Sequence, residues 1–239
     1  LENGDEIENA WFGNCGMASF GQDCIRGQVC FTPLVQEGLF PERVPLVNVE
    51  GGCATASMAF NGAWKDVLSG QAEVSLAIGI EKTYIEGDRE ATMKLFSGGI
   101  DQMDPDEWRD YYKVAGERAG KPFHPDANDA TLFMDTYAMQ ATYHMAKYGT
   151  TQRQIAAGAS KNHYHGSLNP KSQYRFEVSV DDVLEDRSIS HPLTRSMCAP
   201  IGDGGAAAIV CSADYLKAQP ADVQARAVKI RASALSGGK

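Results

Sequence analysis

The chain has 239 residues and a formal net charge of −9, with 43% hydrophobic and 22% charged residues. This balance is typical of a globular protein and excludes collagen-like and disordered chains. The acidic charge argues against a nucleic-acid partner, because phosphate neutralisation needs clustered basic side chains. No apolar run approaches the roughly 20 residues that cross a bilayer, and no secretory signal opens the sequence, so we expect no membrane association.

Six cysteines are scattered along the sequence, and none of them belongs to a CxxC pair. This spacing gives no support for a zinc ribbon, and we expect no metal site. A chain of this length can bury a core without disulfides. We therefore expect reduced thiols and a cytoplasmic protein.

The first predicted elements surround Cys53. Residues 34–37 are expected to belong to a short helix, and residues 45–50 (PLVNVE) form a β-branched run typical of a buried strand. Two glycines and Cys53 follow, and apolar residues then recur at helical spacing up to Gly70, where a helix should end. Residues 74–80 (VSLAIGI) predict the next strand. This order predicts a βαβ unit with parallel strands.

The remainder of the chain is predicted to leave this sheet and return to it. Residues 88–129 are rich in charges, aromatics and prolines, which indicates short helices and loops. The later predicted elements are helices over 130–148 and 151–162, a helix beginning at Val180, and strands over 206–211 and 227–232. Thr150 or Thr151 is expected to cap the second of these helices. We expect an α/β fold with a core over 1–87, an inserted region over 88–150 and a return to the core over 151–239.

Cys53 is the strongest candidate for chemistry. It follows a strand and two glycines and stands at the first turn of a helix, where unpaired N–H groups favour an anion such as a thiolate. The glycines would let a substrate carbonyl approach the backbone closely. This arrangement is typical of a nucleophile elbow. The alternative is a buried cysteine that acts as a small apolar residue.

Three segments in order resemble the thiolase superfamily, most closely its sterol-carrier-protein and archaeal types: VNVEGGCATASMAFNGAWKDVLSGQAEVSLAIGIEK, SKNHYHGSLNPKSQYR and HPLTRSMCAPIGDGGAAAIVCS. The last departs from the family motif SDGAAA, since Gly202 replaces the serine and Gly205 is an extra glycine. The resemblance implies the first half of a thiolase: a βαβ sheet, a central buried helix and an inserted helical and loop subdomain. It also implies that the family's first strand and its C-terminal half lie outside this sequence.

The resemblance further implies an acyl-CoA C-acyltransferase that cleaves or forms the carbon–carbon bond of a 3-oxoacyl-CoA. Coenzyme A would be a substrate, with no further cofactor, and Cys53 would carry the acyl group as a thioester. Other catalytic loops of the family belong to its second half, so this chain is expected to be incomplete as an enzyme. The aromatic-rich insertion favours a bulky or aromatic acyl group, and benzoylsuccinyl-CoA is one candidate.

By the same resemblance, five further residues are candidate substrate contacts: His124, Phe133, Met134, His163 and Asn169. The alternative is ordinary packing for the first three and a polar loop for the last two. His163 and His165 would face the same way on a strand, but no third metal ligand stands nearby in sequence. Glu50, Glu81 and Asp203 are expected to be structural, as acceptors of backbone N–H groups or as part of a tight turn.

Partners and alternative functions also follow from the resemblance. We expect a homodimer and a separate subunit with a zinc ribbon and an OB-fold that binds acyl-CoA. One alternative function is a thiolase-like retro-aldolase acting on a CoA-linked side chain, against which the presence of Cys53 argues. Another is a non-catalytic assembly subunit in which Cys53 is inert.

Overall fold

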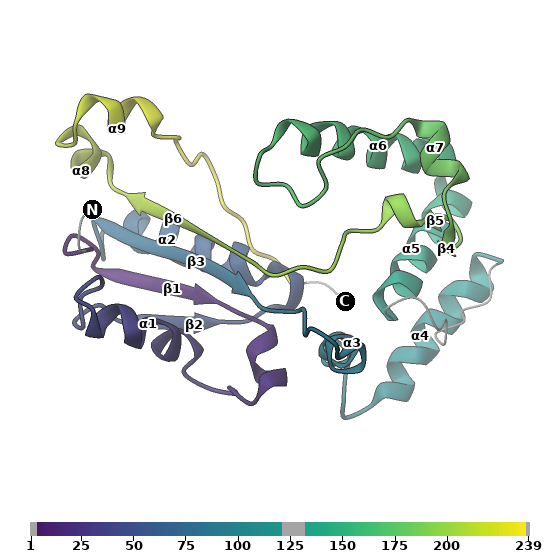
Figure 1. The fold of residues 1–239 in the computed structure, drawn as a ribbon, viewed down its shortest axis with the longest axis horizontal. Coiled ribbons are helices and arrows are strands. Elements are labelled where there is room, and N and C mark those ends of the chain that lie inside the picture. Colours follow the sequence, from purple (N-terminus) through teal and green to yellow (C-terminus); the bar gives the residue numbers. More distant parts are fainter. Residues whose placement is uncertain (1–3, 121–131, 238–239) are drawn as a thin grey trace. The chain divides into compact units, whose positions relative to one another are not determined.

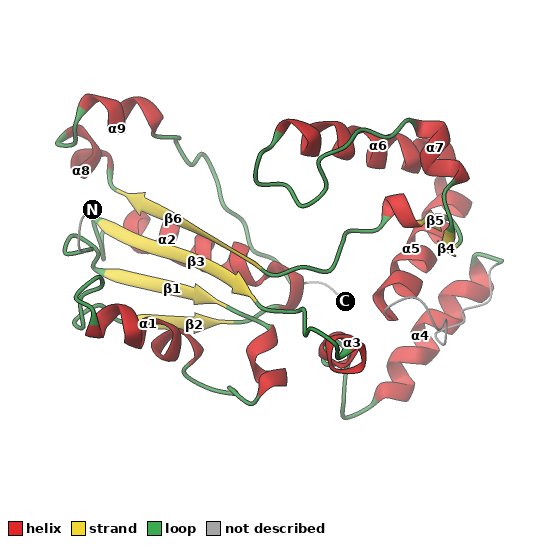
Figure 2. Cartoon of the chain, in the orientation of Figure 1, coloured by secondary structure: helices red, strands yellow, loops and turns green. Residues whose placement is uncertain are grey.

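The computed structural model describes residues 4–120 and 132–237 (Figure 1). They belong to two compact units: unit 1 combines Leu1–Tyr84 with Gly202–Lys239, and unit 2 is Ile85–Ile201. Unit 1 has a sheet flanked by helices, and the described part of unit 2 is mostly helical (Figure 2). The α/β class is confirmed, whereas the division at residues 87 and 150 stays a prediction. Within the described ranges, no helix has both the length and the apolar character needed to cross a membrane.

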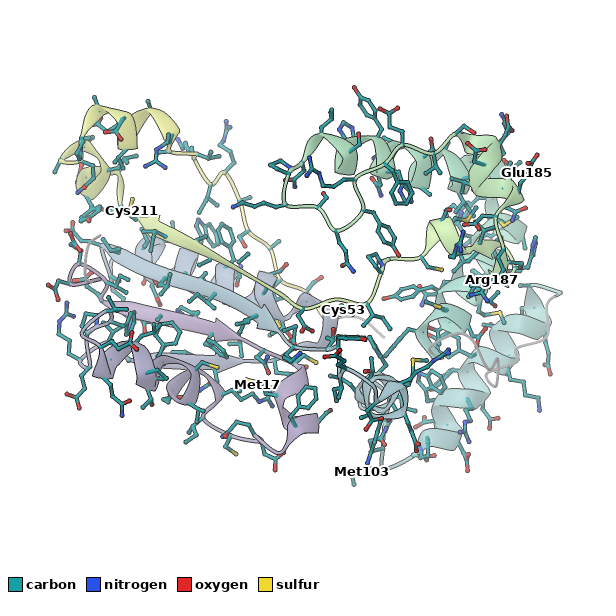
Figure 3. All side chains as sticks on the ribbon, in the orientation of Figure 1. Met17, Cys53, Met103, Glu185, Arg187 and Cys211 are labelled. Carbon is teal, nitrogen blue, oxygen red and sulfur yellow. The ribbon has the colours of Figure 1, made fainter. Side chains whose placement is uncertain are left out.

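Unit 1 contains a four-stranded mixed sheet in the order β2-β1-β3-β6. Its strands are β1 (Asn9–Gly13), β2 (Leu46–Val49), β3 (Val74–Glu81) and β6 (Gly204–Cys211), the last ending at a cysteine labelled in Figure 3. β1 runs parallel to β2 and β3, and β6 runs antiparallel to β3. The predicted parallel direction of β2 and β3 is confirmed. They do not pair with each other, however, because β1, which the sequence did not reveal, lies between them.

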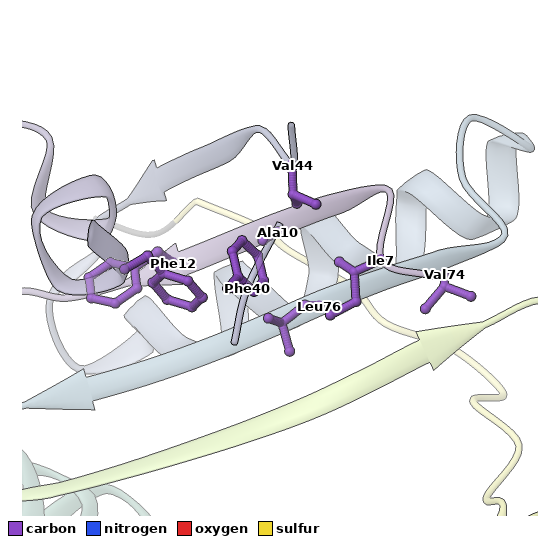
Figure 4. Packing of buried hydrophobic residues seen from close by; sticks show 8 residues of the cluster. Ile7, Ala10, Phe12, Phe40, Val44, Val74 and Leu76 are labelled. Atoms are coloured by element: carbon purple, nitrogen blue, oxygen red, sulfur yellow. The ribbon is translucent and has the colours of Figure 1, made fainter. Parts of the chain in front are cut away.

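Alternating side chains of the sheet build two apolar clusters on its opposite faces. On one face, Phe12 of β1 packs with Phe31 of helix α1 (Arg26–Gln36), near Leu76 of β3 (Figure 4). On the other face, Ala77 of β3 packs with Ala63 of helix α2 (Thr55–Ser69). Helix α1 is thus much longer than the short helix expected from residues 34–37.

Helix α2 lies very close to the sheet because the side chains between them are small. Ala59 and Ala63 are fully buried. A Cβ added to Gly62 would lie 2.3 Å from the ring of Trp11, and one on Gly79 would lie 2.4 Å from Ala56 Cβ. The helix ends at Gly70, which has a left-handed φ of 75°. The predicted end of the helix is confirmed, whereas α2 is buried only on its face toward the sheet and Leu68 on its other face is 67% exposed.

Unit 2 contains five helices and one small hairpin among its described residues. They are α3 (Arg89–Ser97), α4 (Pro105–Arg118), α5 (Leu132–Tyr148), α6 (Gln152–Leu168), α7 (Val180–Glu185), β4 (Ser188–Ser190) and β5 (Leu193–Thr194). Thr151 caps α6 through a capping box with Gln154, which confirms one of the two predicted caps. The helix predicted to begin at Val180 is confirmed as α7.

The strand predicted over residues 227–232 is wrong. After α8 (Ala213–Lys217) and α9 (Ala221–Arg226), the chain runs on without pairing to any described strand. Ile230 packs against the cluster beneath α2, and Asn61 Nδ2 donates to Ser233 Oγ at 2.8 Å. The local β-propensity of this segment is therefore overridden by contacts with the buried Asn61 of α2 and with the cluster beneath that helix.

We predict that Gly62→Ala destabilises unit 1 by about 1–3 kcal/mol, because the new methyl group meets the Trp11 ring. The higher helix propensity of alanine by itself would stabilise the variant by about 1 kcal/mol. A net decrease in the free energy of unfolding would therefore show that the contact with Trp11 outweighs this gain. Urea denaturation measures the effect. Gly158→Ala is the matched control, since a Cβ there meets nothing within 4 Å and should stabilise α6. Equal stabilisation by both changes would contradict the close seating of α2.

Candidate active site

Cys53 lies on an exposed corner between β2 and α2 (Figure 3). It is the middle residue of the 3-10 turn η2 (Gly52–Ala54), which leads directly into α2. Gly52 has a φ of 57°, in the left-handed region that favours glycine. A Cβ added to Gly51 would lie 2.2 Å from the sulfur of Met58. Gly52 is therefore required by the backbone path and Gly51 by the close side chain of Met58, and the alternative of a buried cysteine does not fit the exposure of Cys53.

Hydrogen bonds fix the corner and leave one amide available. Gly51 N donates to Thr55 Oγ1 at 2.9 Å, and the Thr55 hydroxyl donates to Gly52 O at 2.7 Å. Gly52 N donates to Glu50 Oε1 at 2.6 Å, and Ala54 N donates to Gly51 O at 3.1 Å. Among the described residues, none accepts a hydrogen bond from the amide of Cys53. That amide can therefore donate to an oxygen atom bound next to the Cys53 sulfur.

Glu50 also contacts a second cysteine at this end of the sheet. The Cys15 thiol donates to Glu50 Oε1 over 3.5 Å, the same oxygen that accepts the Gly52 amide. Burial, followed by the charge and the hydrogen bond of Glu50, raises the pKa of the Cys15 thiol to about 11. Cys15 is therefore a protonated thiol near neutral pH, whereas a nucleophile must be a thiolate.

The carboxylates expected to be structural do accept backbone N–H groups. Glu81, at the end of β3, accepts from the amides of Cys15 and Gly16, the latter at 2.9 Å. Asp203 accepts from the amides of Thr83 and Tyr84. Together with the bond from Gly52 to Glu50, these contacts confirm the expectation. None of these carboxylates is held in a position that indicates a general base.

A buried carboxylate that the sequence did not reveal fixes α2 on the sheet. Asp66 Oδ2 accepts hydrogen bonds from Asn9 Nδ2 at 2.7 Å, Trp11 Nε1 at 2.7 Å and Ser75 Oγ at 3.0 Å. Asp66 is only 5% exposed. One signal could have found it: Asp66 stands three residues after Ala63 and seven after Ala59, on the buried face of the helix.

Four of the predicted substrate contacts lie in the described part of unit 2, and His124 lies outside the described residues. Phe133 is partly buried in α5 and packs edge-on against Phe96, with ring centroids 6.3 Å apart. Its neighbour Met134 is also partly buried. Asn169 caps the end of α6 and accepts from the amide of Lys171 at 3.0 Å. These contacts do not test a role in binding substrate, so the four assignments stay predictions.

His163 lies within α6, so the expected polar loop is wrong. Its Nε2 lies 3.1 Å from Ser196 O, and its ring stacks on Tyr174 with an interplanar angle of 10°. It lines a cavity of about 410 Å³ with Ser196 and Cys198. Because successive helical residues are about 100° apart, His163 and His165 point in nearly opposite directions. A metal pair between them is therefore excluded.

A second cavity in unit 2 lies between helices α4 and α5. It has a volume of about 700 Å³ and a mainly apolar lining that includes four tyrosines: Tyr111, Tyr112, Tyr143 and Tyr148. The buried Met139 also contributes to the lining. Gln140 Nε2 lies 3.3 Å from the hydroxyl of Tyr112, and Glu107, Asp110, Arg118 and His144 also line the cavity. Such a lining suits a ring-bearing apolar group.

Comparison with known proteins identifies the relationship, although no protein-family model matches the chain. An acetyl-CoA acetyltransferase of Methanothermobacter thermautotrophicus is 31% identical over 201 residues, covering 84% of this chain and 45% of the relative. Sterol carrier protein 2 of Gallus gallus is 32% identical over 207 residues, covering 87% and 35%. The chain belongs to the thiolase superfamily. It spans less than half the length of these relatives.

Two further proteins are similar to the chain, one in sequence and one in structure. The benzoylsuccinyl-CoA thiolase subunit BbsB of Thauera aromatica is 26% identical over 174 residues, covering 73% of this chain and 39% of the relative. A solved structure described as the Ltp2-ChsH2(DUF35) aldolase has a TM-score of 0.59 at 21% identity, covering 92% of this chain and 48% of that one. The structural match supports the thiolase-like fold alone.

We predict that Cys15 resists alkylation until the pH approaches about 11, and that Glu50→Gln makes it react at lower pH. Glutamine has no negative charge to disfavour the thiolate, so the pKa of the Cys15 thiol falls, while burial still holds that pKa above its usual value. Iodoacetamide labelling at pH 9, resolved by peptide mass spectrometry, should therefore be several-fold faster at Cys15 in the variant. Unchanged labelling of Cys15 would contradict the contact with Glu50.

Proposed function

We propose that the chain is the nucleophile-bearing half of a thiolase-type acyltransferase that acts on a 3-oxoacyl-CoA. The Cys53 thiolate would attack the ketone carbon, and the adjacent carbon–carbon bond would break. The electron pair would leave on the α-carbon of the departing acyl-CoA, which then takes up a proton. Coenzyme A would attack the thioester, release the shortened acyl-CoA and regenerate Cys53. The observation that carries this proposal is the exposed Cys53 on its glycine corner.

The surroundings of Cys53 support this chemistry electrostatically. Negative charge develops on the carbonyl oxygen when sulfur attacks, and the unengaged Cys53 amide is the nearest donor. The amides of Gly51 and Gly52 already donate to Thr55 and Glu50. The N-terminus of α2, a helix of 15 residues, adds a favourable dipole at the same place.

The corner alone does not supply the proton transfers of a full cycle. Glu50 and Glu81 already accept hydrogen bonds from backbone amides, and Cys15 holds its own proton. We infer that the proton donor and base come from groups outside this corner, as the two-half organisation of the family implies. The chain would then be acylated at Cys53 but would not turn over by itself.

We propose a bulky or aromatic acyl group as the substrate. The tyrosine-lined cavity between α4 and α5 supports this choice, and so does the similarity to a benzoylsuccinyl-CoA thiolase subunit. His124, Phe133, Met134, His163 and Asn169 are the proposed contacts. Coenzyme A enters as a substrate, and no additional cofactor is proposed. A cytoplasmic location is part of the same proposal.

A retro-aldolase acting on a CoA-linked side chain is the second candidate function. The match to a structure described as an aldolase favours it. That description names two components, which supports our proposal of a partner subunit. Its zinc ribbon and OB-fold are proposed from the family resemblance alone. A homodimer is also proposed from the family resemblance. The retro-aldolase does not require an acylated cysteine, so acylation of Cys53 separates the two candidates.

We predict that incubation with an aromatic acyl-CoA adds one acyl mass to the wild-type chain and none to Cys53→Ala, as measured by intact mass spectrometry. Cys24→Ala is the matched control, because Cys24 is the other exposed cysteine and its removal should leave the adduct unchanged. Equal adducts on Cys53→Ala and wild type would reject Cys53 as the nucleophile. A chain that gains no adduct at all would favour the aldolase or the non-catalytic alternative.

A further inference from the structure

A single carboxylate joins the two segments through which the chain leaves unit 1 and returns to it. Asp203 Oδ1 accepts from the amides of Thr83 at 2.7 Å and Tyr84 at 2.8 Å. Asp203 Oδ2 accepts from Lys82 Nζ at 2.7 Å. In return, the Thr83 hydroxyl donates to Gly202 O at 2.8 Å. The neck, defined here as residues 82–84 together with 202–203, is thus closed by four hydrogen bonds.

The neck lies at the point where the chain passes from unit 1 to unit 2 and back. Tyr84 is the last residue of unit 1 before unit 2, and Gly202 is the first one after it. The β3–β6 pairing reaches the pair Glu81 and Gly204, so the neck continues the ladder beyond its last strand residues. Since β3 runs parallel to β2, the neck lies at the same edge of the sheet from which the chain enters the Cys53 corner.

The hydrogen bonds from backbone amides to Asp203 stabilise the neck more than the ion pair with Lys82 does. The Lys82 and Asp203 side chains are 65% and 39% exposed, and ion pairs this exposed contribute little. Hydrogen bonds from backbone amides to a carboxylate are short and charge-assisted, and they need no ordering of a flexible partner. The hydrogen bond from Lys82, followed by those from Tyr84 and Thr83, lowers the pKa of Asp203, so the carboxylate stays charged at neutral pH.

We propose that Asp203 is a positioning residue that holds residues 82–84 and residues 202–203 together, so that the chain leaves unit 1 and returns to it through one closed neck. Without it, of the four hydrogen bonds only that from the Thr83 hydroxyl to Gly202 O would join residues 82–84 to residues 202–203. This inference does not depend on the chemistry of Cys53.

Hydrogen exchange of the neck amides, resolved by NMR, tests the proposal. In Asp203→Ala we expect the amides of Thr83 and Tyr84 to exchange at least about tenfold faster, with exchange in β1 unchanged. Asp203→Asn keeps an oxygen acceptor and should retain most of the protection. Lys82→Met removes the hydrogen bonds of Lys82 Nζ to Asp203 and to Tyr84 O, leaves the backbone amide bonds to Asp203 in place, and should have little effect. Asp214→Ala is the matched control, since it removes another exposed ion pair of unit 1, that of Asp214 with Lys217.

Two results would overturn the proposal. One is unchanged protection of Thr83 and Tyr84 in Asp203→Ala. The other is a combined result. In Asp203→Ala, faster exchange extends to β1 or the chain does not fold, and in both Asp203→Asn and wild type the amides of Thr83 and Tyr84 exchange rapidly. That pattern would make Asp203 part of general stability and would leave the neck open in the native protein.

Discussion

The structure of unit 1 depends on the close seating of α2 on the sheet. A buried carboxylate is costly unless several donors satisfy it, and Asp66 has three, from Asn9, Trp11 and Ser75. These donors lie on β1 and β3, so a single oxygen ties the C-terminal part of α2 to two neighbouring strands. Glycine and alanine along the interface allow the short separation. With the helix held at this depth, its N-terminus has a fixed position where the chain leaves β2.

The properties of the candidate nucleophile follow from that fixed position. The chain must pass from β2 to α2 within a few residues, which the left-handed Gly52 makes possible. The tight path uses the amides of Gly51 and Gly52 internally and leaves that of Cys53 unengaged. Cys15 is nearby through its contact with Glu50, yet burial and the carboxylate keep its proton in place. The two cysteines at this end of the sheet thereby differ in exposure and in hydrogen bonding.

The sequence predicted the elements whose pattern is strong and local. The runs that became β2 and β3, the periodicity of α2 and its end at Gly70 are of this kind. Strand β1 was missed because it has five residues with Asn9 and Gly13 at its ends. Residues 227–232 were wrongly assigned to a strand because propensity says nothing about whether a free sheet edge accepts them.

The sequence likewise predicted the local part of the site and missed the contacts between distant residues. Cys53 and its two glycines form a contiguous motif, so the sequence was sufficient to find them. The Asp66 network joins residues 57 positions apart, and the contact between Cys15 and Glu50 joins residues 35 apart. Only the tertiary fold brings such pairs together. His163 was placed in a loop because its helix continues through polar residues, where hydrophobic periodicity gives little signal.

The most direct test of this account is competitive labelling of the native chain with a limiting amount of iodoacetamide at neutral pH, followed by peptide mapping. We predict that the label appears first on Cys53, ahead of the exposed Cys24. Both cysteines stand two residues before a helix, but the 3-10 turn η2 joins Cys53 directly to the 15-residue α2, whereas the left-handed Ile25 separates Cys24 from the shorter α1. Label on Cys24 at the same rate or faster would contradict it.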